Sequence, residues 1–129
     1  METYERFDGF IEYYNNWFNK IEQFVENENY SKDEIIITFE LSPVGKWFYS
    51  EGKKEFGNLQ KVIFLETKFI KLHNLVTYLY DAIIDKDQSL IDIYKDDFLV
   101  LSRRMIPNLE LSRDYIIEVK DNTPVINLH

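Results

Sequence analysis

Apolar residues recur three and four positions apart through almost the whole of this 129-residue chain. That spacing places them on one face of an α-helix, and it constrains the fold more than any other feature of the sequence. It predicts four helices, over about residues 3–27, 31–52, 57–85 and 87–120, followed by an irregular tail over 121–129. Because each helix carries one broad apolar face and the connections are short, we expect a single all-α domain, an antiparallel four-helix bundle in up-down-up-down order.

Three local features modify this prediction or compete with it. The stretch "SKDE" fits a capping box, with Ser31 as the cap and Glu34 three residues later. The following "EIIITFEL" is rich enough in β-branched residues for a strand, and "YIIEVKDNTPVINL" has the pattern of a hairpin around "KDNT". The capping box and the uninterrupted apolar spacing from Tyr115 to Val119 favour helices in both places. Pro107 should kink the last helix or split it in two.

Charge and composition narrow the classes of function. The formal net charge is -8 and the pI is about 4.7, whereas a protein that binds nucleic acid or an anionic membrane surface needs a basic face. No apolar run approaches the ~20 residues of a membrane span, and the N-terminus lacks the form of a signal peptide. The chain has no cysteine, so it has no disulfide or thiolate chemistry. We expect a cytoplasmic protein that neither binds nucleic acid nor inserts into a membrane.

Sequence signals of catalysis are scarce. The chain has no Gly-rich phosphate loop and no nucleophile elbow, and carboxylate pairs such as Asp96 and Asp97 sit where a solvated helix face is expected. We therefore predict no enzymatic activity. His73 is the one titratable polar residue on the apolar face of the third helix, and the only other histidine is the last residue, His129. The ring of His73 is either a neutral, hydrogen-bonded part of the core or a metal ligand, but zinc usually needs four ligands.

The stretch "SPVGKWFYSEGKKEFG", residues 42–57, holds three of the four glycines. It resembles the chemoreceptor zinc-binding domain, a small four-helix module of bacterial chemoreceptors and diguanylate cyclases. In that family a His precedes an aromatic or apolar residue by three positions, Cys-x-hydrophobic-Gly-x-Trp follows, and His-x-x-x-His lies on the next helix. Here Trp17 resembles the first aromatic residue, Val44, Gly45 and Trp47 match the second element, and "FIKLH" stands in place of the third. The resemblance covers about residues 7–120.

The resemblance places the metal positions of the family at Tyr14, Ser42, Phe69 and His73, of which only His73 keeps a ligand type. A serine hydroxyl is a poor zinc ligand, phenylalanine has no donor atom, and tyrosine would have to lose its phenol proton. We therefore expect no cofactor, zinc included, and we expect the rings of Tyr14 and Phe69 to fill the space of the metal site. The Tyr14 hydroxyl, Ser42 and His73 are predicted to form a small buried hydrogen-bonded cluster.

The function that the resemblance implies is that of a non-enzymatic bacterial signalling or interaction domain whose metal site is replaced by aromatic packing. Members of the family commonly dimerise, so the resemblance implies a homodimer or a signalling protein as the partner. Tyr13, Trp17 and Phe24 fall off the main apolar face of the first helix and suggest a binding surface. Two alternatives stay open: a small-molecule or metal sensor that uses a pocket around His73, and an unrelated small helical protein with a structural or inhibitor-like role.

Overall fold

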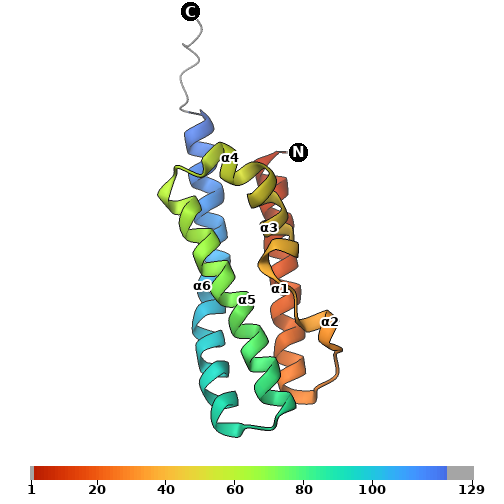
Figure 1. Ribbon diagram of the computed structural model, residues 1–129. Helices are drawn as coiled ribbons and strands as arrows, with labels where there is room; N and C mark the ends of the chain where they lie inside the picture. Colours follow the sequence, from red (N-terminus) through yellow and green to blue (C-terminus); the bar gives the residue numbers. More distant parts are fainter. Residues whose placement is uncertain (1, 122–129) are drawn as a thin grey trace, which may run out of the picture.

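A computed structural model describes residues 2–121 of the chain, and within this range it contains helices and no β-strand. Three long helices run along the length of the molecule (Figure 1), namely α1 (Thr3–Asn27), α5 (Gln60–Ile84) and α6 (Gln88–Asp121). The chain between α1 and α5 begins with two short elements, α2 (Lys32–Ile35) and η1 (Phe39–Leu41). It continues with α3 (Pro43–Trp47), the π-helical turn η2 (Phe48–Gly52) and α4 (Lys53–Phe56), which follow one another without a break in the helical backbone. The prediction of an all-α fold is confirmed.

The first helix, α1, covers the same range that the apolar spacing predicts. Its buried side chains include Phe7, Phe10, Tyr14 and Ile21, three to four positions apart on one face. The helix closes at Glu28, which adopts the left-handed conformation with φ 50° and donates its N–H to the carbonyl of Phe24.

The prediction of a continuous helix over residues 31–52 is wrong. The capping box is present, because the Ser31 backbone N–H donates to the Glu34 carboxylate, but the helix that it starts, α2, ends after one turn. Ile36 follows in an extended conformation with ψ 118°. The β-branched residues Ile36, Ile37 and Thr38 favour that conformation over the helix, and the local preference prevails once the capped turn is complete.

Pro43 accounts for the second break in this segment. A proline disfavours the helical conformation at the residue before it, and Ser42 is extended with ψ 158°. Pro43 then occupies the first turn of α3, where its missing N–H needs no partner. The side chain of Ser42 caps α3 by accepting the N–H of Gly45 at 3.1 Å. Ser42 therefore begins a new helix at the position where the sequence pattern predicts a helix interior.

Two of the glycines permit close contacts within the same segment. A Cβ atom on Gly45 would lie 1.8 Å from the carbonyl oxygen of Phe39, and one on Gly52 would lie 2.8 Å from the ring of Trp47. Gly45 thus lets α3 pack directly on the backbone of η1, and Gly52 makes room for the indole of Trp47.

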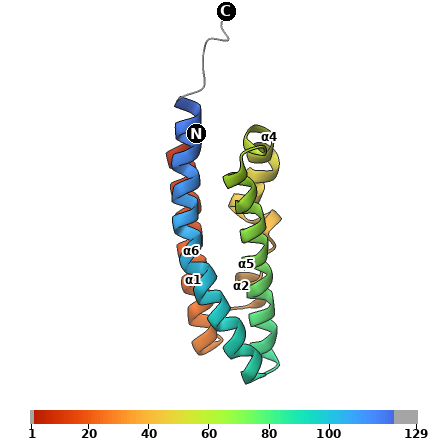
Figure 2. The ribbon, with the colours of Figure 1, turned by 90° about the vertical axis from the view of Figure 1, so that its left-hand side faces the viewer.

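The two remaining long helices, α5 and α6, form an antiparallel pair with a short turn between them, in which Lys86 has φ 55°. Their bounds lie within a few residues of the predicted 57–85 and 87–120. Pro107 lies inside α6 and does not split it. Figure 2 shows α6 changing direction along its length, as expected where a prolyl ring removes a hydrogen bond to the residue four positions earlier.

The competing strand predictions are resolved as far as the structure reaches. The stretch "EIIITFEL" forms no strand, although Ile36 is extended. Tyr115 to Lys120 belong to α6, so this half of the alternative hairpin is helical. The other half, and all but the first residue of the predicted irregular tail over 121–129, lie outside the described residues; Asp121 is the last residue of α6.

The elements pack around one core. α1 contacts α6, α6 contacts α5, and the segment from α2 to α4 contacts both α1 and α5. Figure 2 shows α6 in front of α1 and α5 in front of this segment. The largest fully buried side chains include Phe7, Tyr14, Phe48, Phe69 and Phe98. Among the described helices, none has the combination of length and apolar character that a membrane span requires.

We expect Gly45→Ala to destabilise the protein, because the added methyl group meets the Phe39 carbonyl and one backbone must move. Overpacking of this kind costs about 1–3 kcal/mol or more. Gly9→Ala is the matched control: Gly9 lies in α1, and a Cβ there meets nothing within 4 Å, so this change should stabilise the helix by about 0.5–1 kcal/mol. Urea unfolding of both variants measures the contrast, and equal effects would contradict the close approach at residue 45.

Candidate functional site

A cluster of polar side chains lies in the centre of the core. Tyr14 comes from α1, Ser42 from the cap of α3 and His73 from α5, and their exposed fractions are 0%, 0% and 3%. The Tyr14 hydroxyl lies 2.8 Å from Nε2 of His73 and 3.3 Å from Oγ of Ser42. The structure thus brings together three of the four positions that the family resemblance singles out.

Phe69, the fourth position, completes the group through its ring. Its centroid lies 4.7 Å from that of Tyr14, and on another side it stacks on Phe39 with centroids 5.9 Å apart. Phe69 has an exposed fraction of 0%. The ring of Phe69 therefore packs between those of Tyr14 and Phe39 inside the core.

The hydrogen-bond partners fix the proton positions in the cluster. Nδ1 of His73 lies 2.7 Å from the carbonyl oxygen of Ile37, which can only accept, so Nδ1 carries the proton of the neutral ring. Nε2 then accepts from the Tyr14 hydroxyl. The Ser42 hydroxyl donates to the carbonyl of Phe39 at 2.7 Å while it accepts the N–H of Gly45. Among the described residues, every buried side-chain nitrogen and oxygen has a hydrogen-bond partner.

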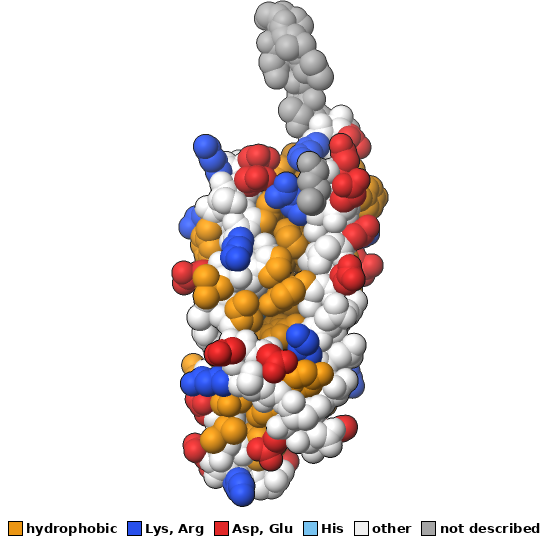
Figure 3. Space-filling model, turned by 90° about the vertical axis from the view of Figure 1, so that its right-hand side faces the viewer, with side chains coloured by type: hydrophobic (Ala, Val, Ile, Leu, Met, Phe, Trp, Pro, Cys, Tyr) orange, Lys and Arg blue, Asp and Glu red, His pale blue; other side chains and the backbone are white. Residues whose placement is uncertain are grey.

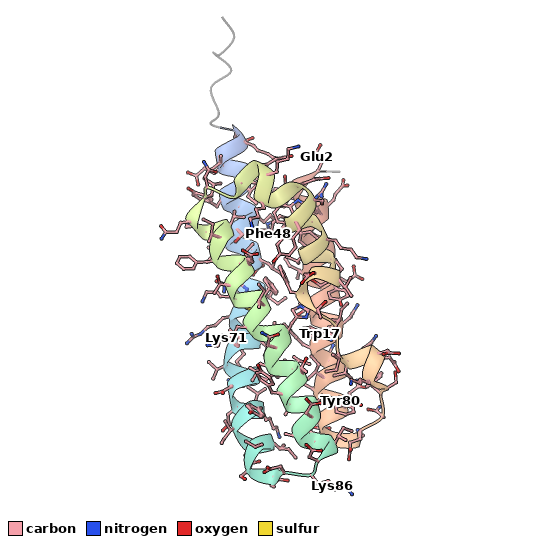
Figure 4. The ribbon with its side chains drawn as sticks, in the orientation of Figure 1. Glu2, Trp17, Phe48, Lys71, Tyr80 and Lys86 are labelled. Carbon is pink, nitrogen blue, oxygen red and sulfur yellow. The ribbon has the colours of Figure 1, made fainter. Side chains whose placement is uncertain are left out.

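Trp17 joins the same cluster from α1. Its ring stacks on the imidazole of His73, with centroids 4.5 Å apart and planes 22° apart, and its indole N–H donates to the carbonyl of Ile35 at 3.0 Å. Figure 4 shows Trp17 below Phe48, farther than Phe48 from the end of the molecule that carries Glu2. The indole thus packs against one face of the imidazole, and its N–H bonds the backbone carbonyl of the last residue of α2.

These contacts show a pattern that the sequence alone does not reveal. The carbonyls of Ile35, Ile37 and Phe39, at alternate positions where the chain leaves α2 and becomes extended, accept hydrogen bonds from Trp17, His73 and Ser42 respectively. Ile35 is the last residue of α2 and Phe39 the first of η1, so the three carbonyls lie at the two ends and in the middle of the short extended link. The β-branched run in "EIIITFEL" indicates that this part of the chain can be extended, but it does not indicate which groups bond its carbonyls.

The Trp47 motif has a different place. Val44 is fully buried, and Gly45 contacts η1 as described above. The ring of Trp47 packs against Phe7 and Phe10, with centroids 5.4 and 5.8 Å away, one to two turns nearer the start of α1 than Tyr14. These residues therefore position the segment that carries Ser42. Their one bond to the polar cluster is the N–H that Gly45 donates to the Ser42 hydroxyl.

Burial keeps the cluster uncharged at neutral pH. Desolvation lowers the pKa of His73 to about 4, although the hydrogen bond to Ile37 acts in the opposite direction. Desolvation by burial also raises the pKa of Tyr14 far above its ordinary value of 10.0. A neutral imidazole and a neutral phenol without access to solvent have no acid–base role near pH 7.

The donor set of this cluster does not fit zinc. Of the four positions only His73 carries a nitrogen, sulfur or carboxylate ligand, and both of its ring nitrogens are hydrogen-bonded. The Tyr14 oxygen would have to lose a proton that burial holds in place. Elsewhere in the range 2–121, no three His, Asp or Glu side chains are grouped so that they could hold a metal ion.

Comparisons of this chain with family models, with curated proteins and with solved structures found no match in any of the three.

We expect the pKa of His73 to make stability pH-dependent. In the unfolded chain His73 takes up a proton near pH 6.5, whereas in the folded protein it does so near 4. Between these values the unfolded state binds more protons, so the free energy of unfolding falls as the pH falls. The loss attributable to His73 should reach about 3 kcal/mol by pH 4.

The control for this prediction is His73→Gln, whose amide offers a donor to Ile37 and an acceptor to Tyr14 but does not titrate. Urea unfolding of both proteins at several pH values between 7 and 4 isolates the histidine, because all carboxylates are common to the two. If the free energy of unfolding falls equally in the two proteins between pH 7 and pH 4, His73 titrates normally in the folded state.

Proposed function

We propose that this chain is a non-enzymatic bacterial signalling or interaction domain, similar to the chemoreceptor zinc-binding domain, in which aromatic packing and neutral hydrogen bonds take the place of the metal. In this proposal the segment from α2 to α4 occupies the position of the second helix of an antiparallel four-helix bundle. The domain acts in the cytoplasm through contacts with a partner, either a second copy or another signalling protein.

One observation carries the proposal. The four positions assigned by resemblance come from three separate parts of the chain, yet they meet: the Tyr14 hydroxyl lies within 3.3 Å of both His73 and Ser42, and the Tyr14 and Phe69 rings are 4.7 Å apart. A chance match of motifs gives no reason for such convergence. The chemistry of the cluster also supports a role without catalysis, because its groups are buried and neutral.

The sensor alternative is less well supported by the same geometry. Tyr14, Ser42 and Phe69 have exposed fractions of 0%, and the polar atoms of the cluster already bond each other. A small molecule at His73 would have to displace aromatic rings and leave buried donors without partners, which costs about 1–3 kcal/mol for each such group. We therefore place partner recognition on the outside of the domain.

Restoring the ligands tests the proposal directly. The triple variant Tyr14→His, Ser42→Cys, Phe69→His adds two imidazoles and a thiolate beside His73. We expect it to bind one equivalent of Zn(II), to take up Co(II) with the intense visible absorption of a tetrahedral site, and to gain thermal stability on binding. Because the variant loses aromatic packing, folding is followed by circular dichroism with and without Zn(II).

A matched control keeps the ligand types but moves one of them. In Tyr14→His, Ser42→Cys, Leu65→His the third ligand lies two turns away from His73 along α5, at another buried position. Zinc binding by the control as tight as that by the restoring variant would remove the support for a former metal site. A molar equivalent of Zn(II) retained by the unaltered protein, with a large rise in melting temperature, would contradict the metal-free part of the proposal.

A further inference from the structure

The apolar side chains exposed to solvent are concentrated on α5 and α6. Of the twelve large hydrophobic residues that are exposed in the described part of the chain, nine lie on these two helices. They include Phe64 (52%), Tyr78 (52%), Val100 (52%) and Leu111 (60%). Exposed apolar surface gathered on one pair of helices is typical of an interaction site.

This concentration corrects the expectation from the sequence. Tyr13, Trp17 and Phe24 were predicted to form the binding surface, but Trp17 and Phe24 are 4% and 3% exposed and Tyr13 is packed partly against the core. Figure 3 shows hydrophobic side chains along the middle of the face that carries α1 and the α2–α4 segment. Several hydrophobic residues of these elements, such as Ile11, Ile36 and Ile37, are partly buried against the core, so part of their surface is already used in packing.

Two grooves follow the seam between α5 and α6. One of about 210 Å³ is lined by residues that include Phe64 and Leu111, and one of about 650 Å³ by residues that include Ile70, Tyr78 and Val100. α5 and α6 face the viewer in Figure 2, and Figure 4 shows Lys71 of α5 pointing away from the bundle. The α5/α6 face, meaning these two grooves and the exposed side chains beside them, therefore runs along most of the molecule.

Charge divides the α5/α6 face into two halves. Lys61 and Lys68 line the first groove, and Lys71 and Arg104 line the end of the second groove nearer to it. Toward the turn that joins the two helices the charge changes sign: Asp97 lines the second groove. Exposed Asp81 and Asp85 follow Tyr78 by three and seven residues, which puts them on its side of α5.

We propose that the α5/α6 face pairs with the same face of a second copy of this chain, with the two copies antiparallel. This proposal deepens the interaction role proposed above and depends on it. In the antiparallel arrangement α5 lies against α5 and α6 against α6, and the basic half of each copy meets the acidic half of the other. In a parallel arrangement every basic residue of one copy would lie at the level of the basic residues of the other, and like charges in contact disfavour it. The antiparallel arrangement leaves only Lys71, at the middle of the face, near its counterpart.

The register follows from α6. Asp97 and Arg104 lie seven residues apart on one side of this helix, and both line the larger groove with Val100 between them. If the two-fold axis passes beside Val100, Asp97 of each copy faces Arg104 of the other. On α5 the same axis passes near Lys71, which lines the groove with Val100, and it brings the end of α5 around Asp81 opposite the end that carries Lys61. The contact is isologous, so each pairing occurs twice.

The size of the face suits this partner. α5 has 25 residues and is about 37 Å long at 1.5 Å per residue, and two adjacent helices are about 20 Å wide. The face thus offers about 700 Å² per copy, near the roughly 800 Å² that a stable interface buries on each partner.

Sedimentation equilibrium of the full chain over a range of concentrations tests the pairing. We expect a species of twice the 15.6 kDa chain mass that dissociates on dilution. Val100→Glu should weaken dimerisation at least tenfold without altering the circular dichroism spectrum, because the side chain is half exposed. Leu41→Glu, at a residue 61% exposed on η1, is the control and should leave the dimer intact.

A charge swap tests the antiparallel register. Arg104→Asp alone places aspartates opposite each other and should weaken the dimer, as should Asp97→Arg alone. The double variant Asp97→Arg, Arg104→Asp should recover dimerisation, since both pairings are rebuilt with the signs exchanged. Double variants that stay monomeric would overturn this register.

Other outcomes identify a different occupant. A chain that stays monomeric at several hundred micromolar would overturn self-association and leave this face to another protein. Loss of the dimer in Leu41→Glu but not in Val100→Glu would move the interface elsewhere. Neither outcome changes the zinc-binding result for the restoring variant, so failure of this inference is distinguishable from failure of the proposed relation to the zinc-binding domain.

Discussion

The fold depends on how the chain around residues 35–39 satisfies its carbonyl groups inside the core. A helix satisfies its own carbonyls, but here the chain leaves the helix after α2, and buried carbonyls without partners are costly. Trp17, His73 and Ser42 each donate to one of them. Because these donors come from α1, α5 and the start of α3, the same bonds fix the extended segment and tie three parts of the molecule together.

The same bonds decide the chemistry of the centre. An imidazole that donates from Nδ1 to a carbonyl and accepts at Nε2 from a phenol is complete as a neutral ring, and burial opposes any charge on it. Metal binding would require the loss of the Tyr14 proton or a break in the His73 bonds. The centre therefore stabilises and positions the helices.

The large apolar side chains of the two halves of the molecule differ in exposure. The aromatic side chains of α1 and of the segment from α2 to α4 are largely used in packing, with Trp47 against Phe7 and Phe10 at one end and the imidazole of His73 in the middle. α5 and α6 bury one face against this core and expose apolar side chains on the other. A face that combines such side chains with segregated charge has features that select both a partner and its orientation.

The sequence by itself determined the helical class and the limits of α1, and it placed α5 and α6 within a few residues, because apolar spacing over 25 residues or more outweighs local ambiguity. Its resemblance to the chemoreceptor zinc-binding domain singled out Tyr14, Ser42, Phe69 and His73. Only the tertiary structure decided which groups satisfy the carbonyls of Ile35 and Ile37, because their donors, Trp17 and His73, lie far away in the chain. It alone also decided which aromatic residues are exposed, since burial depends on neighbouring elements that periodicity within one helix does not specify.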